Sequence, residues 1–259
     1  FNVVYARDGS RRLLMDQFVK RGGQTPKAAI VVVHGGGWKK GDKTKFRALA
    51  LRLAERGYFV AAIEYRLAGE AAFPAAIRDC NAATTFLRDH ADQLGIDPSR
   101  IGAVGGSAGG HLVGLMASGH AVAELKHPAD QKKDSSLAAA AVLAGPLEIA
   151  SGSVAERSIQ SRETSNSVLW MEGDVHQRSE LYRLADAYEK VDSSTPPLLF
   201  ICGSEDNPDR NAKTRSKLDQ LGISNRLVVH PDATHGHWNR SEWIGRVVDD
   251  IDSFFKEQL

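Results

Sequence analysis

Short apolar runs and amphipathic stretches alternate along most of this chain. The apolar runs are rich in Val, Ile, Leu and Ala and have the length of buried strands: 28–34, 58–66, 100–106, 137–145, 198–203 and 226–230. The amphipathic stretches carry apolar side chains at helical spacing: 45–56, 74–94 and 238–255. Strands that alternate with helices predict an α/β fold, a mostly parallel, doubly wound sheet with helices on both faces.

Two other parts of the chain differ from this pattern. Residues 1–5 and 13–20 alternate apolar and polar positions, which is typical of antiparallel edge strands. Residues 148–194 contain no apolar strand run but include Trp170 in polar surroundings. So long a stretch between two strands favours a small cap over the ligand crevice, with a plain surface connector as the alternative. We expect one α/β domain over residues 1–259.

The composition and the net charge limit the classes of protein to which this chain can belong. A length of 259 residues suits one α/β domain with a sizeable core. Charged residues make up 25% of the chain and balance to a net charge of +1, so we expect neither a nucleic-acid nor a membrane partner. Cys80 and Cys202 lie in apolar patterns and are interpreted as core thiols. The histidines show no metal-ligand spacing, so we expect no metal and no cofactor.

The sequence GGSAG at 105–109 joins a predicted strand to an apolar helical stretch. G-x-S-x-G in that context is the pattern of a nucleophile elbow, where small neighbours let a sharp turn present the serine at a helix N-terminus. Backbone N–H groups at that terminus favour a developing oxyanion. Ser107 is therefore the candidate nucleophile. The alternative is a glycine-rich turn whose serine only caps the helix.

A second glycine-rich sequence, HGGGW at 34–38, follows the strand predicted at 28–34. Successive glycines after a buried strand let the backbone turn its N–H groups toward a ligand without interference from a Cβ atom. An acyl-transfer enzyme needs such donors where the carbonyl oxygen becomes negative. A flexible loop is the alternative, but two such motifs, each at the end of a predicted strand, together favour a serine hydrolase.

These motifs resemble the α/β-hydrolase superfamily, and within it the BD-FAE or acetyl esterase/lipase-like branch. The resemblance covers most of the chain and is carried by HGGGWKKGDK at 34–43, EYRL at 64–67, FPAAIRD at 73–79, DPSRI at 97–101, GGSAGGHL at 105–112 and PPLLFICG at 196–203. The chain departs from the family pattern after Gly145-Pro146, where Leu147-Glu148 stands near a frequent Asp, and at 207–210, which is more polar than usual. Both departures concern the substrate pocket.

The resemblance implies the other two members of a Ser-His-Asp triad. In this fold the chain order is Ser, then acid, then His. Asp206 matches the family's acid position, with Glu205 and Asp209 as local rivals. His235 matches the H-G position on the loop after the last strand, where it would act as the base. His237 is the rival base and is otherwise expected at the pocket wall.

The resemblance further implies a serine carboxylesterase that acts on short-chain acyl, acetyl or feruloyl esters, including esters on plant polysaccharide fragments. Three backbone groups are expected in the oxyanion hole: Gly36, Gly37 and Ala108. Three side chains are expected to contact the substrate: Trp38, His237 and Trp170. The partner would be a small-molecule or oligosaccharide ester, and the resemblance favours a secreted or periplasmic enzyme. The alternatives are an amide-directed hydrolase, such as an arylformamidase or a peptidase, and a hydrolase-fold protein that only binds a ligand.

Overall fold

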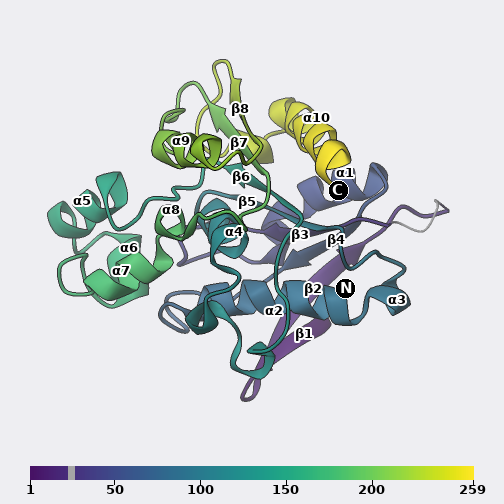
Figure 1. The fold of residues 1–259 in the computed structure, drawn as a ribbon, viewed down its shortest axis with the longest axis horizontal. Coiled ribbons are helices and arrows are strands. Elements are labelled where there is room, and N and C mark those ends of the chain that lie inside the picture. Colours follow the sequence, from purple (N-terminus) through teal and green to yellow (C-terminus); the bar gives the residue numbers. More distant parts are fainter. Residues whose placement is uncertain (23–26) are drawn as a thin grey trace.

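The computed structural model describes residues 1–22 and 27–259 and is built on an eight-stranded sheet (Figure 1). The strand order is β1-β2-β4-β3-β5-β6-β7-β8. The strands are β1 (Val3–Asp8), β2 (Arg11–Phe18), β3 (Ala29–Val33), β4 (Phe59–Ile63), β5 (Ile101–Gly106), β6 (Ala139–Leu143), β7 (Leu198–Gly203) and β8 (Asn225–His230). Strand β2 pairs antiparallel with β1 and β4, and the remaining neighbours run parallel. The prediction of a mostly parallel α/β sheet with an antiparallel edge is confirmed.

Helices cover both faces of this sheet. They are α1 (Arg47–Glu55), α2 (Ala75–Asp89), α3 (Ala91–Leu94), α4 (Ala108–Gly119), α5 (Gly152–Gln160), α6 (Asn166–Met171), α7 (Ser179–Ala185), α8 (Ala187–Lys190), α9 (Ala212–Gln220) and α10 (Ser241–Gln258). Short 3-10 turns complete the set: η1 (Lys43–Phe46), η2 (Ala123–Leu125), η3 (Pro128–Asp130) and η4 (His237–Asn239). Helices α5, α6 and α7 lie together at one side of the sheet (Figure 1).

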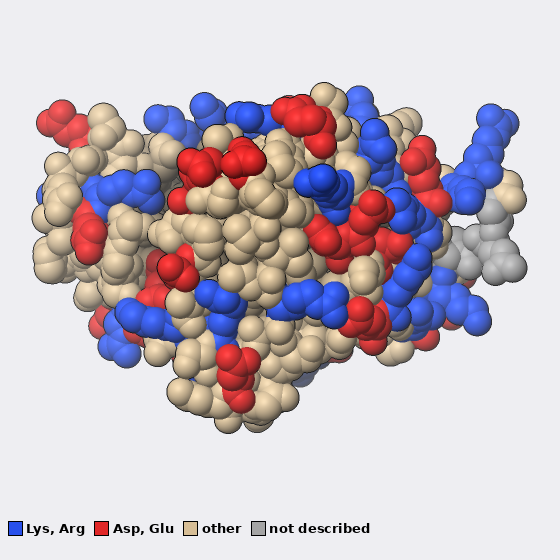
Figure 2. All heavy atoms as spheres, turned by 90° about the horizontal axis from the view of Figure 1, so that it is seen from above, with Lys and Arg blue, Asp and Glu red and all other residues tan. Residues whose placement is uncertain are grey.

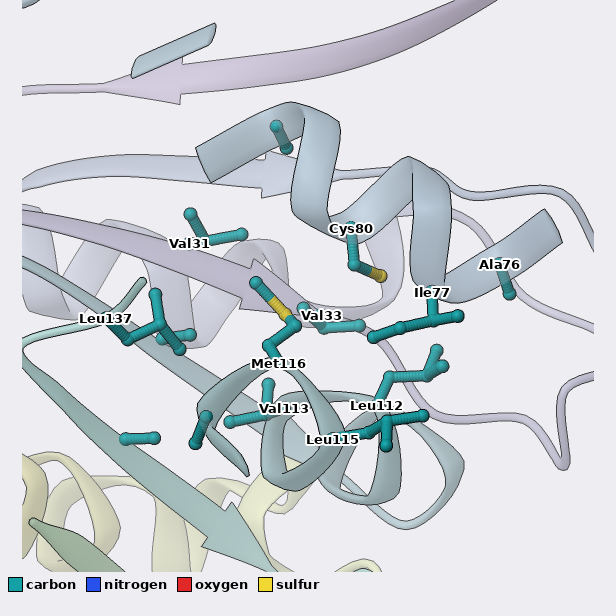
Figure 3. Close-up of a cluster of buried hydrophobic side chains, with 14 of the residues drawn as sticks. Val31, Val33, Ala76, Ile77, Cys80, Leu112, Val113, Leu115, Met116 and Leu137 are labelled. Carbon is teal, nitrogen blue, oxygen red and sulfur yellow. The ribbon is translucent and has the colours of Figure 1, made fainter. Parts of the chain in front are cut away.

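The central strand β3 is apolar throughout because both of its faces are covered. Val31 packs in an apolar cluster with α2 and α4, whereas its neighbour Val32 packs in a second cluster with α1 and α10. Successive side chains of a strand point to opposite faces, so a doubly covered strand needs an apolar residue at every position. Figure 3 shows part of the first cluster, which brings together Val33 of β3, Cys80 of α2 and Met116 of α4.

The helix predicted at 74–94 is broken in two. Helix α2 ends at Asp89, and α3 begins at Ala91, with His90 between them at φ −108° and ψ 18°. The ring Nδ1 of His90 lies 2.8 Å from the carbonyl oxygen of Phe86, four residues earlier. This side-chain hydrogen bond holds the end of α2. Apolar spacing continues across the break, which is why the pattern alone predicts one helix.

Charged side chains of both signs share one face of the molecule. Lys and Arg side chains are interspersed with Asp and Glu side chains on the face seen in Figure 2. Within residues 1–22 and 27–259, no helix has the length and apolar character needed to cross a bilayer. Both cysteines, Cys80 and Cys202, are buried free thiols, as predicted.

Candidate active site

Loops at one edge of the sheet bring the candidate residues together. Strands β5, β7 and β8 run in the same direction, so their carboxyl ends meet at that edge. Ser107 follows β5, Asp206 lies just after β7, and His235 lies on the loop after β8. The polypeptide separates Ser107 from His235 by 128 residues, yet their side chains are in hydrogen-bond contact.

Ser107 occupies a sharp turn between β5 and α4. Its backbone has φ 56° and ψ −121°, and its N–H donates to the carbonyl of Leu143 at 2.8 Å. A Cβ atom at Gly105 would lie 2.3 Å from the oxygen of Gly109, and one at Gly109 would lie 2.2 Å from the oxygen of Val33. Only glycine allows these approaches. The turn therefore has the geometry that the GGSAG sequence predicts for a nucleophile elbow.

A chain of hydrogen bonds runs from Ser107 through His235 to Asp206. The Nε2 atom of His235 lies 3.0 Å from the Oγ of Ser107, and its Nδ1 lies 2.5 Å from the Oδ2 of Asp206. A carboxylate only accepts hydrogen bonds, so Nδ1 carries the proton in the neutral ring. The Nε2 atom then has a free lone pair facing the serine hydroxyl. This arrangement can move a proton from Ser107 to His235.

Asp206 is held from a second side by Arg210, a site residue that the sequence motifs do not indicate. The Nη2 of Arg210 lies 2.6 Å from the Oδ1 of Asp206, and its Nη1 donates to the carbonyl of Ala144. The Asp206 side chain is 8% exposed. Arg210 thus gives this largely buried carboxylate a charged hydrogen-bond partner. The signal present in the sequence is the i,i+4 spacing of the two residues.

The HGGGW loop lies beside Ser107, since a Cβ atom at Gly35 would be 3.3 Å from the Cβ of Ser107. Gly36 and Gly37 have φ values of 142° and 62°. Within the described ranges, the N–H groups of these two glycines have no acceptor. Gly37 and Ala108 line the cavity beside Ser107, whereas Gly36 is not among its described lining residues. Unpaired N–H groups beside a nucleophile can bind an oxyanion.

Trp170 packs against Trp38 and is not among the described residues that line the cavity. It is completely buried and stacks on Trp38, with ring centroids 4.9 Å apart and planes 3° apart. Trp38 does line the cavity, and its Nε1–H donates to the Nδ1 of His111 at 3.3 Å. The Nε2–H of His111 donates to the carbonyl of Ala185 at 2.8 Å, and burial lowers the pKa of His111 to about 4. The expected substrate contact of Trp170 is thus replaced by a contact with Trp38.

His237 also differs from its expected place at the cavity wall. Gly236, at φ 84°, turns the chain into η4, and the His237 side chain is fully buried. Its Nδ1 lies 3.1 Å from the carbonyl of Thr234, and its Nε2 lies 3.0 Å from the Nδ1 of His230. Burial lowers the pKa of His237. His230 in turn contacts Asp250 at 2.8 Å. His237 therefore belongs to a buried polar network beneath the loop of His235.

A cavity of about 520 Å³ opens onto Ser107. Part of its wall comes from the sheet edge: Gly37, Trp38, Ser107, Ala108, Pro146, Asp206, Arg210 and His235. The other part comes from the segment predicted as a cap: Val154, Arg157, Ser161, Thr164, Ser165, Asn166 and Ser167. Among residues 1–22 and 27–259, no group of His, Cys, Asp and Glu side chains is arranged to hold a metal ion.

Comparison with known proteins places the chain in a family. The BD-FAE family model matches residues 15–220. Esterase LipC from Mycobacterium tuberculosis is 29% identical over 245 residues, which cover 90% of this chain and 59% of LipC. Ethyl acetate hydrolase from Pseudomonas putida is 27% identical over 241 residues, which cover 87% of this chain and 69% of that enzyme. The chain thus spans less than two thirds of the length of LipC.

A solved structure has the same fold. The esterase Est2 of the planctomycete Thermogutta terrifontis, with propionate bound, superimposes with a TM-score of 0.82 at 24% identity. The match covers 99% of this chain and 93% of Est2. Since the family model matches most of the sequence and the two structures superimpose over nearly the whole chain, the chain belongs to the BD-FAE family and has the α/β-hydrolase fold.

Proposed function

We propose that this protein is a serine carboxylesterase with Ser107 as nucleophile, His235 as base and Asp206 as the residue that orients the base. The observation that carries the proposal is the continuous hydrogen-bond chain through these three side chains, all of which line one cavity. Membership of the BD-FAE family supports an ester as the bond that is cleaved, as do relatives named esterase and ethyl acetate hydrolase.

The proposed reaction has two halves. In the first, the Oγ of Ser107 attacks the ester carbonyl carbon while the Nε2 of His235 takes the hydroxyl proton. The N–H groups of Gly36, Gly37 and Ala108 donate to the oxyanion, and His235 then gives its proton to the departing alcohol. In the second half, His235 deprotonates a water molecule that attacks the acyl carbon. The carboxylic acid leaves, and Ser107 recovers its proton.

Short-chain acyl esters are the proposed substrates, and acetyl or feruloyl esters of plant polysaccharide fragments are the more specific form of that proposal. The wall formed by residues 161–167 presents hydroxyl and amide groups, which suit a hydroxylated alcohol. Trp38 offers an aromatic surface beside Ser107, which suits a planar acyl group. A panel of acetylated and feruloylated xylan fragments tests this choice. Hydrolysis of simple esters without release from any fragment would contradict the polysaccharide substrate alone.

The activity itself is tested with 4-nitrophenyl acetate, butyrate and octanoate beside a 4-nitroanilide. We expect ester turnover in the wild type and a loss of about 10⁴-fold or more in Ser107→Ala, because only the attacking oxygen is removed. Ser241→Ala is the matched control, since that serine is exposed at the start of α10. A fluorophosphonate probe should label the wild type at Ser107 and leave Ser107→Ala unlabelled.

Each other outcome points to a different function. More than a few per cent of activity in Ser107→Ala would show that another residue is the nucleophile. Preference for the anilide would indicate an amide-directed hydrolase. A folded wild type that turns over none of these compounds would indicate a ligand-binding protein.

A further inference from the structure

The cavity beside Ser107 carries more positive than negative charge. Among the described residues, its lining includes two guanidinium groups, of Arg157 and Arg210, and one carboxylate, of Asp206. Asp206 and Arg210 are in contact at 2.6 Å, so their charges balance each other. The charge of Arg157 remains without a counterpart in the wall.

Arg157 lies on α5, in the segment that forms the outer wall of the cavity. Its Nε donates to the carbonyl of Ser153 at 3.1 Å, one helical turn earlier. Within residues 1–22 and 27–259, its two terminal nitrogens have no hydrogen-bond acceptor and no carboxylate within 4.0 Å, and residues 23–26 (GQTP) contain no acidic side chain. By contrast, Arg162 on the same segment contacts Asp174 at 2.9 Å.

Polar groups continue along this wall from Arg157 to the oxyanion loop. The hydroxyl groups of Ser165 and Ser167 are 2.9 Å apart. The side-chain amide of Asn166 lies so close to Gly37 that a Cβ atom on that glycine would be 2.2 Å from the Asn166 Nδ2. A substrate that fills the cavity from Ser107 outward therefore meets hydroxyl and amide groups and an unpaired guanidinium.

We propose that Arg157 binds a carboxylate carried by the substrate, so that this protein prefers monoanionic esters to neutral esters of the same size. The inference rests on the proposed esterase function of Ser107. A guanidinium offers two parallel N–H donors in a plane that matches the two oxygens of a carboxylate. The carboxylate belongs to either the acyl or the alcohol part of the ester, and the experiment has one arm for each.

In the acyl arm, 4-nitrophenyl hydrogen adipate is compared with its neutral methyl ester. In the alcohol arm, an acetylated methyl glucuronoside is compared with the corresponding acetylated methyl glucoside. We expect the wild type to prefer the anionic member of one pair by about tenfold in kcat/KM, a preference that weakens as salt is added. Arg157→Gln should remove that preference by slowing the anionic member of the pair far more than the neutral member, and Arg157→Lys should keep part of the preference.

Arg183→Gln is the matched control. Arg183 lies on α7 of the same segment, is exposed, pairs with Glu189 at 3.3 Å and is not among the described cavity-lining residues. This variant should keep the wild-type preference. Calorimetric titration of folded Ser107→Ala with the two adipate esters and the two glycosides gives a readout without turnover. In the arm that shows the preference, the anionic member should bind about tenfold more tightly, and adding Arg157→Gln should abolish the difference.

The two proposals fail in distinguishable ways. Hydrolysis of neutral esters without preference for an anionic partner in either arm overturns the role of Arg157 and leaves the esterase proposal standing. Preference that persists in Arg157→Gln also overturns that role. If no ester is hydrolysed, the esterase proposal fails. The calorimetric difference then decides by itself whether Arg157 binds a carboxylate.

Discussion

The carboxylate of Asp206 is shared between Arg210 and His235. One oxygen lies 2.6 Å from the Nη2 of Arg210, and the other lies 2.5 Å from the Nδ1 of His235. The guanidinium fixes the orientation of the carboxylate, which helps to hold the imidazole in place. Its positive charge also opposes the imidazolium that forms when His235 takes a proton. Arg210 is therefore a positioning residue that holds the carboxylate in place and at the same time makes the imidazolium less favourable.

These two effects predict the behaviour of Arg210→Gln. We expect kcat to fall by about 10- to 100-fold, because a less ordered carboxylate holds His235 less well. We also expect the acid limb of the pH–rate profile to move to higher pH, because the imidazolium loses a neighbouring positive charge. The measurement is kcat/KM for 4-nitrophenyl butyrate between pH 5 and 9.

Arg215→Gln serves as the control, because Arg215 lies on α9, which begins two residues after Arg210, but approaches Asp209 instead of Asp206, at 4.0 Å. Its acid limb should match that of the wild type. A fall in kcat for Arg210→Gln with no movement of the acid limb would limit Arg210 to a structural role.

The oxyanion assignment is tested at Gly37. In Gly37→Ala, the new Cβ would stand 2.2 Å from the Nδ2 of Asn166 at a backbone φ of 62°. The loop must shift, so we expect kcat to fall by about 100-fold with little change in KM, since an oxyanion donor acts mainly in the transition state. Adding Asn166→Ala should restore part of kcat by removing the clash.

Gly222→Ala is the matched control for backbone strain, because its φ is 69° and no atom lies within 4 Å of the added Cβ. It should cost about 1 kcal/mol of stability and leave kcat unchanged. If Gly37→Ala raises KM alone, the loop binds substrate and does not hold the oxyanion.

The two neighbouring histidines should give opposite phenotypes. His235→Ala should be as inactive as Ser107→Ala, and adding Asp206→Asn should change little, because the three residues act as one unit. His237→Ala should instead reduce the free energy of unfolding by about 2 kcal/mol, because it removes buried hydrogen bonds to His230 and Thr234. Urea denaturation and steady-state kinetics of both variants separate the two effects.

For this pair, His176→Ala is a surface control, since that imidazole is exposed. It should leave both activity and stability near the wild-type values. A His237→Ala variant that is fully folded and inactive, beside an active His235→Ala, would assign the base to His237.

Buried neutral histidines should make stability depend on pH. Burial lowers the pKa of His34 and of His111 to about 4. In the unfolded chain a histidine titrates near 6.5, so between about pH 6.5 and 4 only the unfolded state takes up these protons. The free energy of unfolding should therefore fall as pH is lowered through this window, by about 2 kcal/mol per histidine at pH 5.

Urea denaturation at pH 7.5 and pH 5 checks this dependence. His111→Gln should remove the contribution of His111 and so reduce the loss of stability between the two pH values. His176→Gln makes the same change at an exposed position and should leave the loss nearly unchanged. An equal loss in the wild type and in His111→Gln would show that His111 does not contribute to it.

The sequence by itself determined the sheet and the order of the candidate triad. Strand β3 must bury both faces, so its apolar run identifies it without any knowledge of its neighbours. The GGSAG turn is equally local, because Gly105 and Gly109 are required by backbone atoms of the elbow and the adjoining strand. Parallel strands share one carboxyl edge, so residues after β5, β7 and β8 could be expected to meet there.

Only the tertiary structure decided which side chains face the cavity. His237 follows His235 by two residues, and Trp170 is a tryptophan like Trp38. The structure nevertheless buries both side chains, Trp170 against Trp38 and His237 against His230. Arg157 lines the cavity because α5 is folded over the sheet edge. The orientation of each of these side chains depends on packing between segments that lie far apart in the chain. A periodic pattern records only whether a position is apolar, so it could not reveal those contacts.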